Sequence, residues 1–168
     1  MKYEDHRELV FEEFKKNIDN KISNRTTLLD VGCYDGWFRN KIIELGWAWI
    51  GIDIEPKIDI ALKGKMEQLP FCDSVIHVIF CSHTFEHSQN PIQALREFQR
   101  VLKGGGLLFM VTPYPCERQI FQMDKTHWII PTEMQIAKLL HMTGFIPIDV
   151  HINKNESEDE KDWHIITI

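Results

Sequence analysis

The residues best suited to chemistry follow an apolar segment near the start of the chain. Residues 28–36 have the sequence LLDVGCYDG, in which a strand-like run leads into a turn with two glycines. Gly32 and Gly36 lack a Cβ and adopt positive φ readily, so the backbone can approach a nucleotide-like ligand beside a helix N-terminus. The carboxylate of Asp30 would suit a cationic group of that ligand. Alone, the pattern is equally compatible with an ordinary strand-to-helix turn.

A second carboxylate ends the next apolar segment. Asp53 follows the run IGI about twenty residues after the glycine turn, where a carboxylate can accept hydrogen bonds from both hydroxyls of a ribose. Asp53 by itself is also compatible with an ordinary strand-end carboxylate. The turn and the carboxylate together favour a ribose-bearing cofactor.

A scaffold that joins several strand ends must position these residues. Short apolar runs alternate with amphipathic stretches after Asn24, which is typical of an α/β fold with a doubly wound, mostly parallel sheet. Only residues 54–57 separate the second expected strand from the third, so the usual crossover helix is missing or vestigial. The expected strands are 27–31, 48–53, 58–62, 75–81, 106–111, 145–152 and 163–168. The expected helices are 37–45, 91–102 and 132–142, with Gly46 at the C-cap of the first.

The N-terminal segment has the pattern of an amphipathic helix. Val10, Phe14, Ile18 and Ile22 recur every four residues among charged residues, which predicts an apolar stripe along one helix face. We expect residues 1–24 to contain a helix that packs on the core. With 168 residues, of which 43% are hydrophobic, we expect one domain that spans 1–168.

Composition narrows the classes of partner and the compartment. The formal net charge of −6 disfavours nucleic acid as a partner, because binding to phosphates depends on Lys and Arg. The sequence has neither a membrane span nor the apolar core of a signal peptide, so we expect a cytoplasmic protein. The four cysteines form no C-x-x-C pair, which favours reduced thiols and predicts no metal site.

Several motifs, in order, resemble those of the class I S-adenosylmethionine-dependent methyltransferases. Residues 30–36 (DVGCYDG) are similar to the acidic-x-Gly-x-Gly-x-Gly turn of that family, and Asp53 to its ribose-binding carboxylate. Residues 69–73 (LPFCD) and 100–106 (RVLKGGG) resemble the segments before its fourth and fifth strands. Residues 124–128 (DKTHW), followed by a helix that ends in TGF, resemble the type 11 subgroup that acts on small molecules. The resemblance covers residues 28–168 and implies a Rossmann-like sheet with an antiparallel C-terminal strand.

The resemblance implies S-adenosylmethionine as cofactor and S-adenosylhomocysteine as product. The backbone of residues 32–34 would line the methionine portion, Asp53 would hold the ribose and Ile54 would flank the adenine. Lys65 and Met66 would lie at the adenine edge, and residues 81–83 would approach the methionine amino group and the methyl. The expected cofactor-binding residues are Asp30, Gly32, Cys33, Tyr34, Gly36, Asp53, Ile54, Lys65, Met66, Cys81, Ser82 and His83.

Two departures from the family pattern affect this site. Tyr34 stands where the family often has its middle glycine, so its side chain must point away from the cofactor. Lys65 stands where an aspartate is common, and an ammonium group cannot accept a hydrogen bond from the adenine amino group. Adenine recognition would then depend on the backbone.

Catalysis of methyl transfer requires mainly alignment, because the sulfonium already makes the methyl electrophilic. Orientation of two reactants can contribute about 7–11 kcal/mol, and a general base helps when the acceptor is a hydroxyl or a protonated nitrogen. Histidine is the side chain best poised for this near neutral pH. The candidates are His127 and His83, each of which is also compatible with a structural or acceptor-positioning role.

Two other functions remain open from the sequence. A nicotinamide-dependent oxidoreductase would also need a glycine turn and a ribose-binding acid, but neither Tyr34 nor Trp37 supplies the further glycines of G-x-G-x-x-G. A non-catalytic cofactor-binding protein with a degenerate site would explain Tyr34 and Lys65. For an enzyme we expect a small-molecule acceptor, methylated on carbon, oxygen or nitrogen, and the sequence leaves the oligomeric state open.

Overall fold

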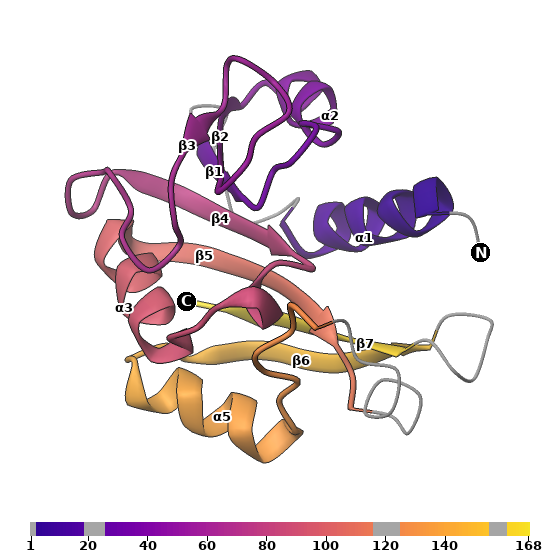
Figure 1. The fold of residues 1–168 in the computed structure, drawn as a ribbon, viewed down its shortest axis with the longest axis vertical. Coiled ribbons are helices and arrows are strands. Elements are labelled where there is room, and N and C mark those ends of the chain that lie inside the picture. The colour runs from indigo at the N-terminus through magenta and orange to yellow at the C-terminus, as the bar shows by residue number, and fades with distance from the viewer. Residues whose placement is uncertain (1–2, 19–25, 116–124, 155–160) are drawn as a thin grey trace.

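The structure, a computed structural model, describes residues 3–18, 26–115, 125–154 and 161–168 (Figure 1). The helices are α1 (Tyr3–Ile18), α2 (Arg39–Glu44), α3 (Pro91–Val101) and α5 (Glu133–Met142), with a short 3₁₀ helix at Phe85–His87. The strands are β1 (Thr27–Val31), β2 (Ala48–Asp53), β3 (Leu62–Lys63), β4 (Ile76–Ser82), β5 (Leu102–Pro113), β6 (Pro147–Lys154) and β7 (Lys161–Thr167).

The strands form one seven-stranded sheet in the order β3-β2-β1-β4-β5-β7-β6. The pairs from β3 to β5 are parallel, and β7 runs antiparallel to both β5 and β6. The predicted doubly wound α/β fold with an antiparallel C-terminal strand is therefore confirmed. The strand order reverses between β1 and β4, and in such sheets ligands bind beyond the carboxyl ends of the strands at this point.

Successive residues of the strands serve opposite faces of the sheet, because side chains alternate along a strand. In β1, Leu28 belongs to one buried cluster and Leu29 to the other, and in β4 Val78 and Ile79 divide in the same way. One cluster includes residues of α3 and α5, and the other includes residues of α1 and α2. Figure 1 shows these two pairs of helices on opposite sides of the long strands β4 and β5.

Two of the helices begin with well-defined caps. The side chain of Asn90 accepts a hydrogen bond from the backbone of Gln93, and Pro91 occupies the first turn of α3. Thr132 and Gln135 form a reciprocal capping box at the start of α5. Within the described residues, no helix is both long enough and apolar enough to cross a membrane.

The expected N-terminal helix packs on the sheet. Phe14 is fully buried and makes edge-on contacts with Phe80 of β4 and Phe109 of β5, with ring centroids 5.0 and 5.3 Å apart. Val10 and Ile18 are buried with it, whereas Ile22 lies outside the described residues. The apolar stripe thus fixes the start of α1, where His6 and Arg7 lie, against the sheet.

The segment after β2 follows a different path from the one expected. No helix joins β2 to β3, as predicted, but the predicted strand at 58–62 is wrong because β3 is only Leu62–Lys63. The side chain of Ile58 lies where a Cβ on Gly36 would be, 2.3 Å from its Cδ1, and the N–H of Ala61 donates to the carbonyl of Ile58. Ile58 therefore packs under the glycine turn in a bend and does not pair in the sheet.

Other boundaries shift by a few residues. Helix α2 begins at Arg39 and not at 37, because the N–H of Trp37 donates to the carboxylate of Asp35 in a turn. Strand β5 begins at Leu102, before a register shift in its pairing with β4, so it is longer than the predicted 106–111. Neither shift moves the strand ends at which the candidate site lies.

Candidate active site

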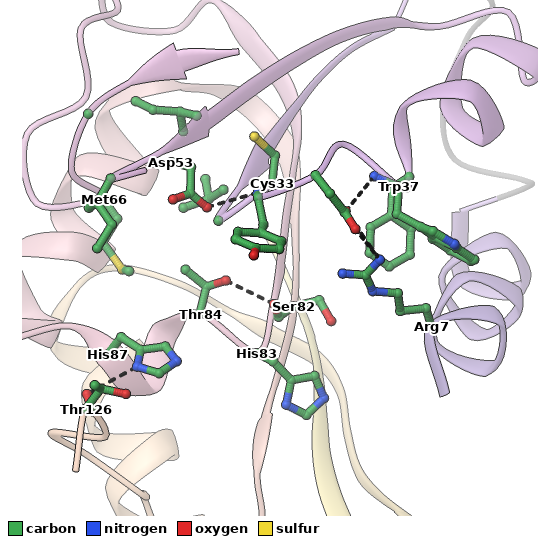
Figure 2. A pocket seen from close by; sticks show the side chains of 18 of the residues that line it. Arg7, Cys33, Trp37, Asp53, Met66, Ser82, His83, Thr84, His87 and Thr126 are labelled. Carbon is green, nitrogen blue, oxygen red and sulfur yellow. Dashed lines mark hydrogen bonds and ion pairs between the residues drawn. The ribbon is translucent and has the colours of Figure 1, made fainter. Parts of the chain in front are cut away.

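A pocket of about 500 Å³ lies at the carboxyl ends of β1, β2 and β4 (Figure 2). Its walls come from residues 31–35, 37 and 38 at and after the end of β1, from 52–54 at the end of β2 and from 82–84 at the end of β4. The first turn of α1 closes one side, and His87 and Thr126 contribute to another. The pocket is within the size range of small-molecule sites, about 300–1,000 Å³, and lies at the predicted switch point of the sheet.

The glycine turn forms the floor of this pocket. Gly32 has a φ of 77°, and a Cβ added there would lie 2.0 Å from the Oγ1 of Thr84. The Thr84 hydroxyl donates to the carbonyl of Ser82, which holds the threonine against the turn. Only a glycine at position 32 therefore allows the ends of β1 and β4 to approach so closely and leaves bare backbone on the pocket wall.

Asp53 lies beside this turn, and its carboxylate is fixed by two backbone groups. One oxygen accepts a hydrogen bond of 2.9 Å from the N–H of Tyr34, and the other accepts one of 2.8 Å from the N–H of Glu55. A carboxylate has about four lone-pair positions, so two acceptor sites are left for hydroxyl donors in the pocket. The arrangement matches that expected for a ribose-binding acid.

Two residues of the pocket have strained backbones. Tyr34 and His83 have φ values of 40° and 48°, a region that residues other than glycine seldom occupy. Such strain costs on the order of 1–3 kcal/mol and tends to be kept where a site requires it. The left-handed turn at Tyr34 aims its N–H at Asp53 and leaves its side chain 50% exposed at the rim.

The first turn of α1 contributes a cation to the pocket. The guanidinium of Arg7 donates to both carboxylate oxygens of Asp35, at 2.9 and 3.3 Å, and lies 5.8 Å from the centre of the Trp37 ring. Asp35 lies within the glycine turn, so this pair connects α1 to the cofactor side of the pocket (Figure 2).

The predicted cofactor residues divide into two groups. Those that line the pocket are Gly32, Cys33, Tyr34, Asp53, Ile54, Met66, Ser82 and His83. Asp30, Gly36, Lys65 and Cys81 do not line it among the described residues. Cys81 is fully buried in β4, Gly36 packs against Ile58, and Lys65 is exposed and pairs through its backbone with Gln68. Direct contact of these four with a ligand in the pocket is not supported by the geometry.

Asp30 has an interior role in the structure. Its carboxylate is buried and accepts a hydrogen bond of 3.0 Å from the indole N–H of Trp49. Burial raises the pKa of Asp30 to about 7, and the Trp49 hydrogen bond offsets part of that rise. Burial likewise raises the pKa of the Cys33 thiol to about 12, so this thiol stays neutral in the pocket wall.

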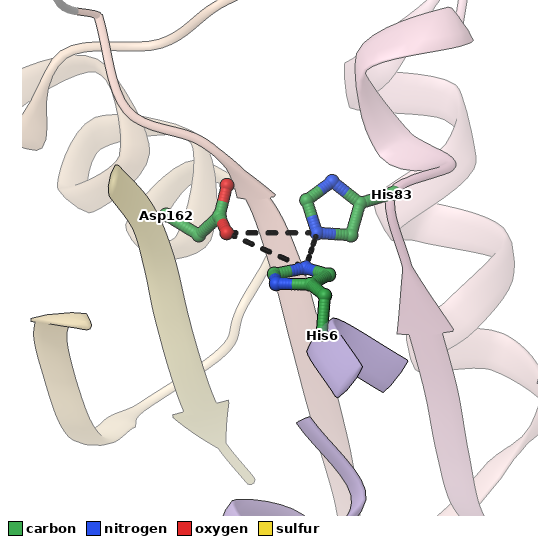
Figure 3. A group of neighbouring side chains, drawn as sticks. All are labelled: His6, His83 and Asp162. Atoms are coloured by element: carbon green, nitrogen blue, oxygen red, sulfur yellow. Dashed lines mark hydrogen bonds and ion pairs between the residues drawn. The ribbon is translucent and has the colours of Figure 1, made fainter. Parts of the chain in front are cut away.

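The other side of the pocket is formed by histidines. The Nε2 atoms of His6 and His83 lie 2.8 Å apart, and each lies within 3.7 Å of the Oδ2 of Asp162 (Figure 3). The Nδ1 of His83 lies 3.7 Å from the buried carboxylate of Glu86. Burial, and then the charge of His83, lower the pKa of His6 to about 4. Burial also opposes a charge on His83, but Glu86 and Asp162 outweigh it and raise the pKa of that imidazole.

His127, the other predicted catalytic residue, lies behind this wall. It does not line the pocket among the described residues, and its ring packs edge-on against His87 with centroids 4.9 Å apart. Its segment is fixed to the 3₁₀ helix by hydrogen bonds from the N–H groups of Trp128 and Ile129 to the carbonyl of Glu86. The Nδ1 of His127 is buried without a hydrogen-bond partner among the described residues, so it remains available to a ligand or water.

The sequence analysis missed residues that reach the pocket from other elements. Among these are His6, Arg7, Thr84, His87 and Thr126. Their neighbours in sequence form no pattern that indicates a ligand, and His6 and Arg7 lie in a helix interpreted only as packing. The position of Thr84, two residues after the end of β4, was the one available signal.

Comparison with known proteins supports the predicted family. Residues 29–110 match the family model for the methyltransferase domain. The match includes the glycine turn, Asp53 and the segments at 69–73 and 100–106 that carry the resemblance in the sequence.

Relatives of known name are similar over much of the chain. The malonyl-[acyl-carrier protein] O-methyltransferase of Buchnera aphidicola is 27% identical over 124 residues, which cover 68% of this chain and 49% of that protein. The tRNA U34 carboxymethyltransferase of Campylobacter jejuni is 25% identical over 166 residues, which cover 84% of this chain and 56% of that protein. The chain therefore spans about half the length of these relatives.

The fold agrees with solved structures. A SAM-dependent methyltransferase from Archaeoglobus fulgidus superposes with a TM-score of 0.73 and 22% identity, over 96% of this chain and 93% of that one. At this identity the likeness concerns the fold. Together with the family match over residues 29–110, it supports the prediction of a class I S-adenosylmethionine-dependent methyltransferase domain and of its cofactor.

Proposed function

We propose that this chain, a class I S-adenosylmethionine-dependent methyltransferase by fold and by the family of residues 29–110, transfers a methyl group to a small-molecule acceptor. One observation carries the proposal. The bare backbone at Gly32 and the carboxylate of Asp53 face one pocket, and that pocket has titratable imidazoles on its opposite side.

The cofactor fits the residues on one side of the pocket. Asp53 would accept hydrogen bonds from the ribose, the backbone of residues 32–34 would lie against the methionine portion, and Ile54 and Met66 would flank the adenine. Lys65 is exposed outside this wall, so adenine selection would depend on backbone and apolar contacts. Arg7 is the cation within the pocket that suits the carboxylate of the methionine portion.

When bound, S-adenosylmethionine supplies an activated methyl group, so the residues of the chain mainly orient the acceptor and exclude water. His83 lies at the end of β4 beside Ser82, on the wall that faces the glycine turn. Glu86 and Asp162 raise the pKa of this imidazole, which can donate a hydrogen bond to an acidic or oxygen-bearing acceptor. His6, whose pKa is lowered, stays neutral at pH 7.

The proposal also specifies that the acceptor is a small molecule and not a macromolecule. A pocket of about 500 Å³ and a net charge of −6 favour a small molecule over the phosphate backbone of RNA. The relatives act, by their names, on an acyl-carrier protein and on tRNA, so a macromolecular acceptor is the alternative to be tested. A reactive group presented on a carrier would still enter the same pocket.

A labelled-methyl assay tests the proposal directly. The purified protein would be incubated with labelled S-adenosylmethionine and, in separate reactions, with a metabolite library, a malonylated acyl-carrier protein and bulk tRNA. Methylation within the library supports the proposal. If only the carrier protein or tRNA is methylated, the proposal of a small-molecule acceptor is overturned. The proposal that the chain is a methyltransferase would still hold.

Calorimetry separates the enzyme from the other two interpretations. S-adenosylhomocysteine should bind in a one-to-one ratio, more tightly than a nicotinamide dinucleotide. Tighter binding of the dinucleotide would defeat the methyltransferase proposal. Binding of S-adenosylhomocysteine without methylation of any of the three acceptor classes would favour a non-catalytic cofactor-binding protein.

A further inference from the structure

We infer that His6, His83 and Asp162 form a binding site for one divalent zinc ion at the acceptor side of the pocket. The three residues come from the first turn of α1, the end of β4 and the start of β7, and their side chains converge on one point (Figure 3). The sequence analysis predicted no metal from the spacing of the cysteines, and the three residues of this site lie far apart in the chain.

The distances between the three donor atoms fit a metal ion. The two Nε2 atoms are 2.8 Å apart, and the Oδ2 of Asp162 is 3.6 Å from that of His6 and 3.7 Å from that of His83. A point inside a triangle with these sides lies about 2.0 Å from all three corners, which is the length of zinc bonds to imidazole nitrogen and carboxylate oxygen, about 2.0–2.2 Å. A small dication can therefore bind all three atoms with little movement of the side chains.

The outer ring nitrogen of His83 faces a buried carboxylate, and a small side-chain movement would bring the two within hydrogen-bond distance. Its Nδ1 lies 3.7 Å from a carboxylate oxygen of Glu86, and Glu86 is 1% exposed. Histidine ligands commonly donate their second ring N–H to a carboxylate, which fixes the tautomer and strengthens the metal bond. The other carboxylate oxygen of Glu86 accepts a hydrogen bond from the hydroxyl of Thr112 and is thereby held in place.

The site would have an open side toward the pocket. His6 and His83 both line the pocket, whereas Asp162 is buried behind them. Two imidazoles and one carboxylate with a free position are typical of zinc ions that bind water or substrate. We assign to this position an anionic, oxygen-bearing ligand such as a carboxylate, and this part of the inference rests on the proposed function because that ligand would be the methyl acceptor.

A second group of possible donors lies nearby and provides the rival site. Glu86, His87 and His127 offer donor atoms within 4.8 Å of one another. A hydrogen bond of 3.2 Å joins the Nδ1 of His87 to the carbonyl of Thr126, which lies outside this group, whereas the hydrogen bond between the Nε2 atoms of His6 and His83 lies within the first group and would be replaced by metal bonds. Glu86 is better placed to support His83, so we assign the metal to the first group.

Titration with Zn²⁺, followed by calorimetry on the metal-free protein without cofactor, tests the site. We expect one ion per chain, a rise in the melting temperature, and a loss of affinity of at least tenfold in each of His6→Gln, His83→Gln and Asp162→Asn. His141→Gln is the matched control, because His141 is exposed in α5, and it should bind as the wild type does. Circular dichroism would establish that each variant is folded, and Glu86→Gln should weaken binding less than loss of a ligand does.

Two results would overturn the metal site. One is the absence of saturable binding by the wild type. The other is loss of binding in His127→Gln with unchanged binding in His6→Gln, which would place the ion at the rival group. These measurements use neither cofactor nor acceptor. The metal site can therefore be disproved while S-adenosylhomocysteine still binds, and the proposed function can be disproved while the metal still binds.

The open position has its own test. In the Co²⁺-loaded protein, addition of acetohydroxamate should change the visible absorption spectrum, and this change should be absent in His6→Gln. An unchanged spectrum in the wild type would exclude a ligand position on the metal and leave a purely structural ion.

Discussion

The two sides of the pocket are built in different ways. The cofactor side consists of residues 32–35 and Asp53, which belong to two consecutive strand ends and are connected through the backbone. The histidine side joins His6, His83 and Asp162, which come from the first, middle and last parts of this sequence and meet only through their side chains. One side depends on local turns, and the other depends on the whole fold.

This difference affects how each side responds to change. On the cofactor side, main-chain N–H groups hold Asp53, so most substitutions of neighbouring side chains preserve the hydrogen bonds. On the histidine side, the packing of α1 through Phe14 and the pairing of β7 with β5 fix the distances between the imidazoles and the carboxylate. We therefore expect substitutions on the cofactor side to act on affinity and those on the histidine side to act on turnover.

The largest expected effect is that of Asp53→Ala. The change removes a carboxylate that would accept hydrogen bonds from two ribose hydroxyls, each worth about 1.5–3 kcal/mol with a charged acceptor. We expect the affinity for S-adenosylhomocysteine, measured by calorimetry, to fall on the order of 100-fold. Asp59→Ala, at an exposed residue in the following bend, serves as the control and should bind normally. Unchanged affinity in Asp53→Ala would remove the assignment of the ribose site.

His127→Ala tests whether the histidine side extends beyond the pocket lining. The Nδ1 of His127 is buried without a partner among the described residues, and its ring contacts His87, which lines the pocket. If His127 moves a proton during the reaction, methyl transfer should fall on the order of 100-fold, the lower end of general acid–base effects. Cofactor affinity should stay near that of the wild type.

The interpretation of His127→Ala depends on its control. His141→Ala, in the exposed last turn of α5, should leave both the rate and the affinity unchanged. Full activity of His127→Ala with the true acceptor would confine the functional histidines to those that line the pocket.

Asp30→Asn should stabilise the protein in a pH-dependent way. Burial raises the pKa of Asp30 in the folded state to about 7, whereas an unfolded Asp titrates near 3.9. The unfolded state ionises first, so the wild type loses stability as the pH rises from about 4 through 7. The asparagine variant avoids this loss and retains an acceptor for the Trp49 indole.

Urea denaturation of the wild type and Asp30→Asn at pH 5 and pH 8 measures this effect. We expect the stability advantage of the variant to be larger by about 2 kcal/mol at pH 8, since each pKa unit corresponds to about 1.4 kcal/mol and relaxation reduces the full shift. An advantage that is equal at the two pH values would mean that the Asp30 carboxyl has an ordinary pKa.

The sequence was sufficient for the parts of the fold that local patterns encode. The bounds of β1 and β2 match those predicted, and Asn90 and Thr132 cap helices that were expected within one residue of their observed ends. The prediction failed at 58–62, where an apolar run packs under Gly36. Apolar residues alone do not distinguish a strand from a bend that fills a gap in the core.

The reach of local sequence patterns also explains which site residues could be predicted. The cofactor side was predictable because the glycine turn and Asp53 are separated by a fixed strand–helix–strand unit. Asp30 was assigned to the ligand on its motif alone, whereas in the structure one oxygen of its buried carboxylate accepts a hydrogen bond from Trp49 of β2. His6 and Asp162 lie 156 residues apart and meet only after α1 and β7 pack on the sheet, so no local pattern could indicate them.

The smallest expected effect is that of Tyr34→Gly, which tests how far the cofactor side depends on its backbone. Tyr34 has a φ of 40°, and a left-handed conformation costs roughly 1–2 kcal/mol for a residue with a Cβ. Glycine removes this cost but adds conformational entropy to the unfolded chain, about 0.4–1 kcal/mol, so the stability measured in urea should change by less than about 1 kcal/mol.

Cofactor affinity in Tyr34→Gly should stay within about threefold, because the N–H that binds Asp53 belongs to the main chain and is kept. The phenol ring is half exposed at the rim, so its loss should expose backbone without the removal of a ligand contact. A gain in S-adenosylhomocysteine affinity of more than tenfold by calorimetry would mean that the ring obstructs the pocket. In that case the native tyrosine would limit cofactor entry, and the cofactor side would depend on a side chain after all.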